Sequence, residues 1–395
     1  KLLIHMLKFK KKIPYGLHHI NYKDIKAVNK VLKSNFLTQG DQVPKFEKNL
    51  NLKFGSKYTT VTNSATSALH ISCLALGLKK GDYLWTSAIS FVASSNCGLY
   101  CGSKIDFLDI NRITNNIDID YLKKKLKIAK IKKKLPKIIV LVHLAGAPCE
   151  LDQIKKLAKI YKFKIIEDAS HAAGSIYKDN LIGNCKYSDI TVFSFHPVKI
   201  FTTAEGGACL TNDKKTNKKL KLLRNHGINK TLSKKTLKTK GSWFYDQQNL
   251  GLNYRMNDIQ AALGIEQLKK IDNFVKKRNK IAKFYNSQFK NIKIEIPKFE
   301  KNIKFSFYLY IIKLKNKNSK LHKEIFEKLR SKGINVNLHY IPIYKHSFYK
   351  KFKFKKINFP NSEEYYKSAI SLPIYPTLSK QDQIYVAKIL KELVG

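Results

Sequence analysis

Lys199 and Asp168 are the two side chains of this sequence best placed to do chemistry, because each follows a segment with the pattern of a buried strand. Residues 190–195 are apolar, β-branched and aromatic, and Pro197 ends this segment because proline has no N–H for a sheet. A lysine flanked by apolar residues can lose its proton and act as an amine nucleophile. Asp168 follows the predicted strand 163–167, where a carboxylate can keep a heterocyclic nitrogen protonated. Taken alone, a solvated lysine and a helix-capping or metal-binding aspartate would explain both residues.

A third group of residues has the composition of an anion site. The segment 63–67, Asn-Ser-Ala-Thr-Ser, joins a predicted strand to a predicted helix, where free N–H groups and small hydroxyl side chains suit a phosphate. Ordinary helix capping accounts for the same residues. Ser194 lies near the end of the strand that precedes Lys199. Phe91 is predicted to begin a helix, and its ring can cover a flat ligand or fill the core.

Together these features meet the needs of pyridoxal 5′-phosphate. The lysine binds this cofactor covalently, the aspartate keeps the pyridine nitrogen protonated, and the helix N-terminus anchors the phosphate. Each feature alone is weak evidence for this cofactor. The order of the features along the chain makes the combination specific.

Strands and helices must alternate to bring these residues to one edge of a sheet. The apolar patterns do alternate, which predicts an α/β fold with a large, mostly parallel sheet and helices on both faces. The predicted strands of this sheet are 58–62, 83–87, 105–110, 138–144, 163–167, 190–195 and 208–211. The predicted helices around it are 22–33, 43–54, 64–78, 91–100, 120–133, 150–161, 214–224, 258–270 and 274–289.

The pattern changes beyond residue 290 and predicts a smaller α+β unit. Its predicted strands are 305–314 and 334–339, and its predicted helices are 320–332, 362–371 and 380–393. We therefore expect a large cofactor-binding domain over residues 14–285, including the N-terminal segment, and a small C-terminal domain over residues 286–395.

The charge of the chain is extreme. There are 76 Lys and Arg residues against 28 Asp and Glu residues, which gives a formal net charge of +48. Such a charge first suggests a nucleic-acid partner. The lysines, however, are spread along nearly every predicted helix, and arginine, which favours bidentate phosphate recognition, is scarce. We therefore expect no dedicated nucleic-acid partner, although the positive electrostatic potential of the protein would attract an anionic substrate.

The cysteines favour a reducing compartment. Cys73, Cys97, Cys101, Cys149, Cys185 and Cys209 form no CxxC pair, and several lie in apolar segments. This pattern predicts free thiols, a cytoplasmic protein and no metal site. The basic start, residues 1–12, lacks the features of a signal peptide, and no stretch has the length of a membrane span.

Motifs spread over almost the whole chain resemble the DegT/DnrJ/StrS family of sugar aminotransferases. They are NSATSALH (63–70), EDASHAAGS (167–175), FSFHPVKIFTTAEGGACLTND (193–213), LRNHGI (223–228), LGLNYRMNDIQAALGIEQLKKID (250–272) and VNLHYIPIY (336–344). The resemblance implies the aspartate aminotransferase fold, which is pyridoxal-phosphate fold type I. It also implies that Lys199 and Asp168 are the catalytic residues, with Lys199 as the covalent ligand and Asp168 as the partner of the pyridine nitrogen.

The resemblance assigns the other site residues as well. His171 falls near the ring oxygen of the cofactor, and Ala65, Thr66 and Ser194 fall at its phosphate. Asn253 falls where the family lends a side chain to the phosphate of the neighbouring subunit, which implies a homodimer with shared active sites. The nucleotide-sugar site is implied at Tyr15, Asn35, Phe36, Leu37, Thr38, Ala65, Ser194, Asn253, Asn337, Leu338, His339 and Tyr340.

The IPYG opening, the FLTQG turn and the SFHPVK loop resemble one branch of the family. That branch transfers an amino group from glutamate to C4 of a UDP-linked 4-keto-6-deoxy-N-acetylhexosamine, for pseudaminic acid or a related surface sugar. Another nucleotide-linked keto sugar, carried on GDP or dTDP, is the alternative substrate. A non-catalytic cofactor-binding regulator, and a dehydratase with histidine in place of the lysine, are disfavoured by Lys199. The basic insert 230–240 matches no pattern, and its role stays open.

Overall fold

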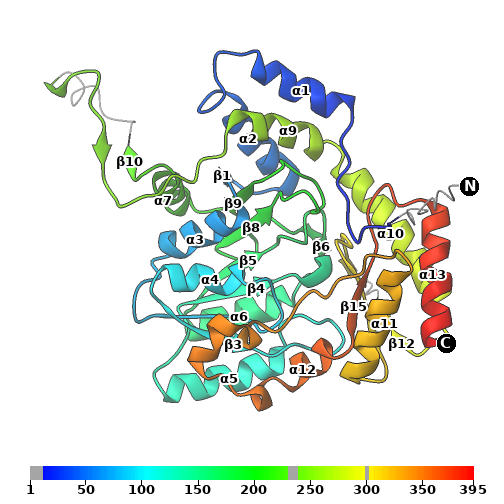
Figure 1. The fold of residues 1–395 in the computed structure, drawn as a ribbon. Helices are drawn as coiled ribbons and strands as arrows, with labels where there is room; N and C mark the ends of the chain where they lie inside the picture. Colours follow the sequence, from blue (N-terminus) through cyan, green and yellow to red (C-terminus); the bar gives the residue numbers. More distant parts are fainter. Residues whose placement is uncertain (1–11, 230–238, 299–301) are drawn as a thin grey trace, which may run out of the picture.

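A seven-stranded sheet forms the centre of the computed structural model, which describes residues 12–229, 239–298 and 302–395 (Figure 1). The strands lie in the order β1-β9-β8-β5-β4-β2-β3. Their bounds are β1 Tyr58–Thr62, β2 Tyr83–Ser87, β3 Lys104–Leu108, β4 Ile138–Val142, β5 Lys164–Asp168, β8 Ile190–Ser194 and β9 Gly207–Thr211. From β3 to β8 all neighbours pair in parallel, and β9 is antiparallel to both β8 and β1. The predicted mostly parallel sheet is confirmed.

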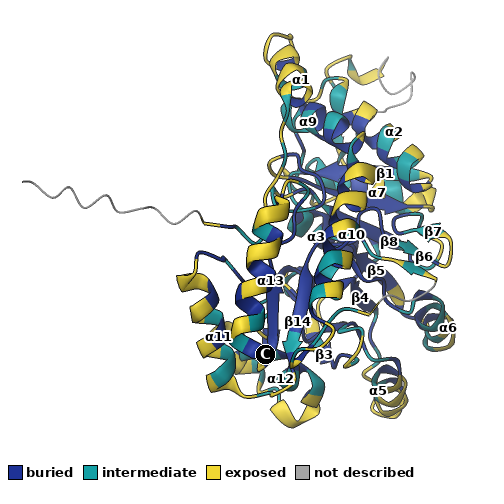
Figure 2. Cartoon of the chain, turned by 90° about the vertical axis from the view of Figure 1, so that its right-hand side faces the viewer, coloured by how far each residue is buried: buried dark blue, intermediate teal, exposed yellow. Residues whose placement is uncertain are grey.

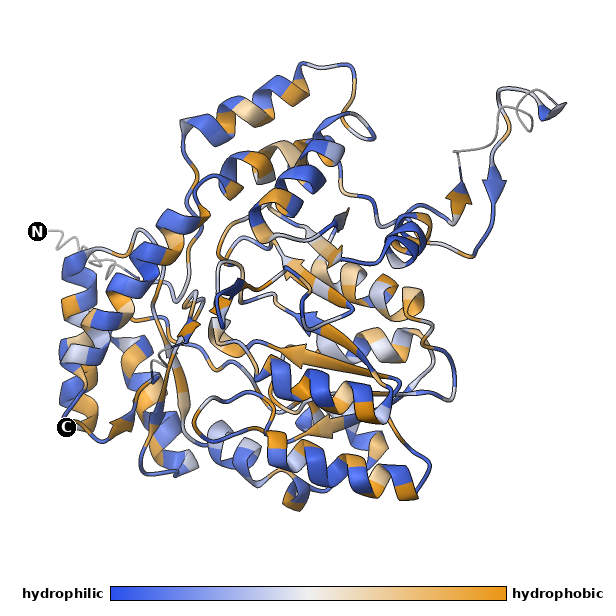
Figure 3. Ribbon diagram, turned by 180° about the vertical axis from the view of Figure 1, so that it is seen from behind, coloured by the Kyte–Doolittle hydropathy of each residue, from blue (hydrophilic) through white to orange (hydrophobic). Residues whose placement is uncertain are grey.

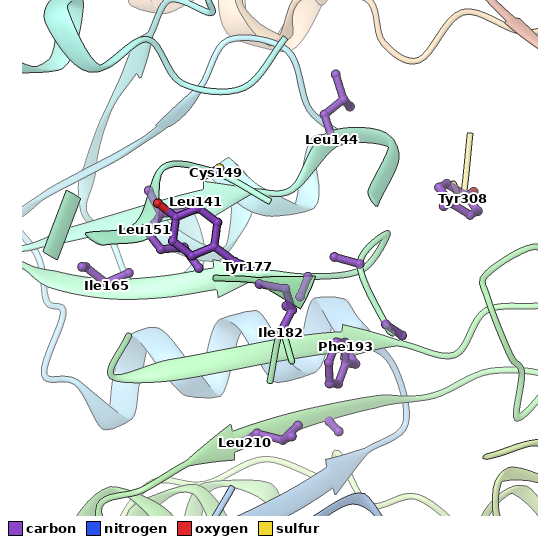
Figure 4. Close-up of a cluster of buried hydrophobic side chains, with 14 of the residues drawn as sticks. Leu141, Leu144, Cys149, Leu151, Ile165, Tyr177, Ile182, Phe193, Leu210 and Tyr308 are labelled. Atoms are coloured by element: carbon purple, nitrogen blue, oxygen red, sulfur yellow. The ribbon is translucent and has the colours of Figure 1, made fainter. Parts of the chain in front are cut away.

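The central strands are apolar on both faces, as strands covered by helices on both sides must be. In β4, for example, Ile139 and Leu141 belong to one buried cluster, and Ile138 and Val140 belong to another. The alternation follows from the two-residue period of a strand. Figure 4 shows side chains from four neighbouring strands in the first of these clusters, and they are Leu141, Ile165, Phe193 and Leu210.

Helices cover the two faces as the alternating sequence pattern predicts. Apolar residues of α3, α4 and α7 are buried in the cluster that contains Ile138 and Val140. Apolar residues of α2, α5, α6 and α9 are buried in the cluster that contains Ile139 and Leu141. The bounds are α1 Tyr22–Leu32, α2 Gln42–Phe54, α3 Ala65–Ala75, α4 Ala93–Tyr100, α5 Ile119–Ile131, α6 Leu151–Tyr161, α7 Lys214–Arg224, α9 Asp258–Leu268 and α10 Ile271–Gln288. Figures 2 and 3 show the consequence, since the strands are buried and apolar while the outer helices turn exposed, polar faces to solvent.

The C-terminal part builds a second core around a three-stranded antiparallel sheet, β12-β14-β15. The bounds are β12 Ile294–Glu295, β14 Tyr310–Leu314, β15 Ala369–Leu372, α11 Ser319–Ser331, α12 Pro360–Tyr366 and α13 Lys380–Val394. Between α11 and α12 the chain returns to the large sheet, where Ile343, Tyr349 and Phe359 pack against Phe107 of β3. The boundary between the two predicted domains, at residues 285 and 286, stays a prediction.

Outside the large sheet, several further strands are only two residues long. They are β6 Ile176–Tyr177, β7 Asn180–Leu181, β10 Ile228–Asn229, β11 Asp246–Gln247 and β13 Ile303–Lys304. β10 and β11 form a small hairpin that projects from the body beyond α7 (Figure 1). The predicted basic insert falls largely on residues 230–238, which lie outside the described residues.

Three predicted elements of the C-terminal part are wrong. The predicted helix 362–371 ends at Tyr366, and the next residues form β15 because they pair with β14. The predicted strand 305–314 begins only at Tyr310, opposite the last residue of β15. The predicted strand 334–339 has only isolated bridges, from Ile334 to Ile13 and from Asn337 to Ser371. Strand formation therefore depends on a continuous partner strand rather than on local apolar content alone.

The start of α4 also differs from its prediction. The helix begins at Ala93, so Phe91 precedes it in the loop that follows β2 instead of lying in its first turn. Among the described residues, no helix combines the length and the apolar character that crossing a membrane requires.

Candidate active site

The carboxyl ends of β1, β5 and β8 meet at one edge of the large sheet. β5 and β8 are parallel neighbours, so Asp168 and Ser194 end at the same edge. β1 runs parallel to β8 because both are antiparallel to β9, and there Gly207 pairs with both Thr62 and Ser194. The helix start after β1 and the loop that carries Lys199 are thereby brought to the carboxyl edge, where α/β folds bind ligands.

A cavity of about 770 Å³ opens at this edge. Its walls contain most of the residues predicted for the site, and these are Tyr15, Ala65, Thr66, Phe91, Asp168, His171, Ser194, Lys199, Asn337, Leu338, His339 and Tyr340. Ser64, Ser90, Ser170, Val198 and Tyr308 also line it. The volume is within the range of cavities that bind cofactors and small substrates.

Lys199 projects into this cavity from a tight turn, in which its backbone N–H donates to the carbonyl of His196 over 2.9 Å. Its Nζ lies 4.5 Å from the centre of the Tyr308 ring. Burial lowers the pKa of Lys199 to about 8, and the nearby negative charge of Asp168 opposes this shift. About a tenth of Lys199 is therefore an uncharged, nucleophilic amine at pH 7, and this fraction rises towards pH 8.

Asp168 is buried at the end of β5 and is held by two serine hydroxyls. Ser94 of α4 donates to its Oδ2 over 2.6 Å, and Ser170 donates its hydroxyl to Oδ1 over 2.6 Å and its backbone N–H over 3.2 Å. Ser90 in turn contacts Ser94 over 2.8 Å. These hydrogen bonds fix the orientation of the carboxyl group at the edge of the sheet.

The N-terminus of α3 supplies backbone donors to the same cavity. Ser64 is the N-cap, and its hydroxyl accepts from the N–H of Ser67. The N–H groups of Ala65 and Thr66 have no acceptor within the helix because they belong to its first turn. β9 passes close beside this turn, since a Cβ placed on Gly207 would lie 2.6 Å from the nitrogen of Ala65. With the hydroxyl of Ser194 on the neighbouring strand, this corner is suited to an anion.

His171 is neutral and has one favoured tautomer. Burial lowers its pKa, and the nearby positive charge of Lys199 adds to this effect. Its Nδ1 accepts from the backbone N–H of Ala145 over 3.3 Å, so the proton is on Nε2, which lies 3.1 Å from the hydroxyl of Tyr340. The hydroxyl of Tyr340 is thereby free to donate into the cavity.

Aromatic side chains from the C-terminal part and the N-terminal segment close one side of the cavity. The ring of Tyr15 lies 5.2 Å from that of His339, and the carbonyl of Tyr15 accepts from the N–H of Ile374. His339 is also held by Ser371, 2.9 Å from its Nδ1, and burial, helped by Lys199, lowers its pKa to about 3. Tyr15, Tyr308 and Tyr340 therefore form an aromatic wall beside Lys199.

Phe91 lies at the rim of the cavity. Its side chain is 57% exposed, and its ring centre lies 6.1 Å from that of Tyr340. The alternative prediction for this residue, a ring that fills the core, is wrong. Its position is suited to covering a flat ring, and that role stays a prediction.

The remaining predicted residues lie outside this cavity. Asn35, Phe36, Leu37 and Thr38 follow α1, and the carbonyl of Leu37 accepts from the N–H of Asp258 at the start of α9. Phe36 is 64% exposed. Asn253 is exposed and forms a backbone bridge with Asn225. Within the single chain, therefore, the structure does not bring these residues to Lys199.

Sequence reasoning missed three residues that shape the site. Ser94 and Ser170 orient Asp168, and Tyr308 lies against Lys199. Ser170 could have been found, because it lies two residues beyond Asp168 in the same turn. Ser94 and Tyr308 gave no signal, since a serine in a helix and a tyrosine in an apolar segment are common.

Known proteins of one family match nearly the whole chain. The model of the DegT/DnrJ/EryC1/StrS aminotransferase family matches residues 18–391. The UDP-4-amino-4,6-dideoxy-N-acetyl-beta-L-altrosamine transaminase of Campylobacter jejuni is 40% identical over 379 residues, which cover 96% of this chain and 96% of the relative.

Solved structures are similar over nearly the whole length. Helicobacter pylori PseC, an aminotransferase of pseudaminic acid biosynthesis, superimposes with a TM-score of 0.88 at 34% identity and covers 97% of this chain and 99% of its own. The PLP-form of a putative sugar aminotransferase from Streptococcus pneumoniae has a TM-score of 0.87 at 28% identity and covers 97% of this chain and 98% of its own. The predicted fold type is thereby confirmed.

Proposed function

Because this chain belongs to the DegT/DnrJ/EryC1/StrS aminotransferase family, we propose that it transfers an amino group from glutamate to C4 of a UDP-linked 4-keto-6-deoxy-N-acetylhexosamine. One observation carries the proposal. Lys199, Asp168, Ser194 and the start of α3 face a single cavity of about 770 Å³. A family member that had lost catalysis would not need this set of groups.

The groups present fit pyridoxal 5′-phosphate. The amides of Ala65 and Thr66 and the hydroxyl of Ser194 would hold its phosphate, and the carboxylate of Asp168 would pair with its pyridine nitrogen. Lys199 would bind it covalently. Tyr340, held by His171, would donate to the ring oxygen, and Phe91 would cover the ring. When bound, the cofactor supplies a carbonyl that accepts amines and a ring that withdraws electrons.

Lys199 then carries the proton in both halves of the reaction. Its Nζ takes a proton from the α-carbon of the amino donor, and in the second half it delivers a proton to C4 of the sugar. Both tasks require an amine that changes charge easily, and burial, which lowers the pKa of Lys199 to about 8, supports them. The wall of Tyr15, Tyr308 and Tyr340 limits the access of water to this nitrogen.

The sugar substrate would lie between the sheet edge and the C-terminal wall. Tyr15, Asn337, Leu338, His339 and Tyr340 line the cavity on that side. They offer two phenol groups, an amide and a neutral imidazole, which suit the hydroxyl and N-acetyl groups of a hexosamine. The high positive charge of the chain favours a nucleotide diphosphate.

Asn253 and residues 35–38 support a homodimer with shared sites, because within one chain they lie outside the cavity. The neighbouring hairpin of β10 and β11 extends away from the body (Figure 1). Large apolar side chains on either side of β11 are exposed to solvent. The exposed fraction is 80% for Trp243, 60% for Tyr245 and 89% for Leu250. A second copy of the chain would cover such side chains and would receive Asn253 at its own cavity.

A half-reaction tests the substrate. The enzyme is first converted to its aminated cofactor form with glutamate and freed of the keto acid, and each keto sugar is then added while the visible absorbance is followed. We expect the UDP-linked N-acetyl keto sugar to restore the original absorbance fastest and to become aminated at C4, as read by mass spectrometry and NMR. A GDP- or dTDP-linked keto sugar that reacts much faster would overturn the substrate but not the aminotransferase assignment.

A further inference from the structure

The aromatic ring of Tyr308 contacts two side chains of the candidate active site. Nζ of Lys199 lies over this ring, 4.5 Å from its centre, and the ring of His171 lies 4.2 Å from it at an angle of 31°. An ammonium group within about 6 Å of an aromatic face is attracted by the negative potential of that face. Because Tyr308 is only 4% exposed, water screens this attraction little. The ring therefore favours the charged form of Lys199, whereas burial opposes it.

The backbone that presents this ring has an unusual conformation. Phe307 has a φ of 48°, in the left-handed region that bulky side chains rarely adopt. The residue before it, Ser306, is tied to the turn around His171. Its N–H accepts no solvent but donates to the hydroxyl of Ser175 over 3.0 Å, and its own hydroxyl donates to the carbonyl of His171 over 2.7 Å. These bonds hold the segment in the conformation that points Tyr308 at the cavity.

A buried arginine holds the same segment from the other side. Nη1 of Arg278, on α10, donates to the carbonyls of Phe307 over 3.2 Å and Tyr308 over 3.1 Å, and to that of Ile374 over 2.7 Å. The side chain is 1% exposed. Burial lowers the pKa of Arg278 to about 10, so the guanidinium stays charged at neutral pH. A charged donor binds carbonyls more strongly than a neutral one, so Arg278 can stabilise a strained backbone.

We propose that Tyr308 stabilises the protonated amine of Lys199 through the face of its ring, and that Arg278 positions Tyr308 for this task. The inference rests on the proposed function, in which Lys199 takes a proton from one atom and delivers it to another. Between these steps the amine is charged inside the cavity, and the ring face offsets part of the cost of that charge. The hydroxyl is not needed, because burial raises the pKa of Tyr308 and the phenol keeps its proton.

The other titratable side chains of the cavity do not replace the ring. Burial lowers the pKa values of His171 and His339, so both imidazoles are neutral. Burial raises the pKa values of Tyr15 and Tyr340, so both phenols keep their protons. Asp168 supplies a negative charge, but in the proposed function this charge is paired with the cofactor. The remaining titratable groups of the cavity walls are partly or largely exposed, and they are His196, Glu205 and His346.

The test changes the electrons of the ring and keeps its shape. Tyr308→Phe and three phenylalanine analogues, with one, two and three ring fluorines at position 308, are prepared as apoenzymes. Fluorine withdraws electron density from the ring face with little change in size. The rate of covalent capture of pyridoxal phosphate is then measured against pH by stopped-flow absorbance. Competitive acetylation of Lys199 in the same apoenzymes, read by peptide mapping, reports the same titration without the cofactor.

Tyr308→Phe should keep the native midpoint, because the ring face remains. Each added fluorine should lower the midpoint, by about half to one pH unit over the whole series. A midpoint that stays constant across the series, or one that has already fallen fully in Tyr308→Phe, would overturn the role of the ring. Neither readout uses a sugar or an amino donor, so a failure of the proposed function leaves this result unchanged.

Arg278→Lys tests the positioning. Lysine has no planar fork of donors to hold several carbonyls, so the ring should leave its place over Nζ of Lys199. The midpoint should fall, and fluorination of residue 308 should then have little further effect. Arg278→Gln, which donates without a charge, is the second variant if the first does not fold. Arg330→Lys is the control, because Arg330 of α11 donates to the carbonyl of Val336. A full fluorine effect in a folded Arg278 variant would overturn the positioning role.

Discussion

The hydroxyl of Ser94 donates a hydrogen bond to Oδ2 of Asp168 over 2.6 Å and so joins α4 to the end of β5. Ser94 is completely buried, and Asp168 is 7% exposed. A buried carboxylate without such donors would leave its oxygens without hydrogen-bond partners, which costs free energy. Ser94 and Ser170 are therefore the residues that orient Asp168 at the sheet edge.

Ser94→Ala should weaken cofactor binding. One hydrogen bond to a charged group contributes about 1.5–3 kcal/mol, so we expect the dissociation constant of pyridoxal phosphate to rise roughly tenfold or more. Equilibrium dialysis of the apoenzyme measures it. Ser95→Ala is the control, because Ser95 contacts the carbonyl of Val92 and the hydroxyl of Tyr349 instead of Asp168. An equal loss of cofactor affinity in both variants would mean that Ser94 contributes to folding and not to the orientation of Asp168.

Lys199→Ala should abolish transamination, with a loss of at least about 10²–10⁴-fold, because the variant lacks both the covalent ligand and the proton carrier. In the unmodified enzyme, borohydride should fix the cofactor on the peptide that contains Lys199, as read by mass spectrometry. A modified lysine elsewhere in the chain would refute this assignment.

Asp168→Asn should fold normally but transaminate poorly. The neutral amide cannot stabilise a protonated pyridine nitrogen, so the ring withdraws electrons less strongly. Steady-state kinetics should show a large fall in kcat, and thermal unfolding should change little. Near-normal turnover in this variant would show that Asp168 has another role.

The covalent capture of the cofactor by the apoenzyme should depend on pH through Lys199. The attacking amine is uncharged above its pKa, which burial lowers to about 8. The observed rate should therefore rise about tenfold per pH unit below this value and level off above it. Stopped-flow absorbance from pH 6 to pH 10 measures the profile. A midpoint near 10.5, the ordinary value for lysine, would contradict the shift.

Mixed dimers should recover activity if the active sites are shared. Lys199→Ala and Asn253→Asp are each expected to be inactive, but a hybrid dimer contains one site with both native side chains. Random exchange of equal amounts should give about a quarter of the native activity, because half of the dimers are hybrids with one good site of two. Each variant mixed with itself is the control. If light scattering finds a monomer and this monomer has full activity, shared sites are excluded.

The strands of the large sheet and the positions of its reactive residues are encoded locally in the sequence. β4 is continuously apolar, and β5 and β8 contain buried apolar and β-branched residues before a turn, so the local pattern predicts Asp168 and Lys199 at or beyond strand ends. The helix start at Ser64 is equally local, because capping depends on residues three apart. These features depend on neighbours in the chain and need no distant partners.

Contacts between distant segments set what surrounds those residues. The segment 362–371 became part helix and part strand because β14 lies beside it, and Phe91 came to the cavity rim instead of the core. The partners Ser94 and Asp168 lie 74 residues apart, and Lys199 and Tyr308 are joined only when the C-terminal part folds over the sheet edge. The lowered pKa of Lys199 has the same origin, since burial depends on which distant side chains exclude water from its Nζ. Local pattern encodes the elements and their ends, whereas the environment of a reactive group is a sum over contacts that only the folded chain brings together.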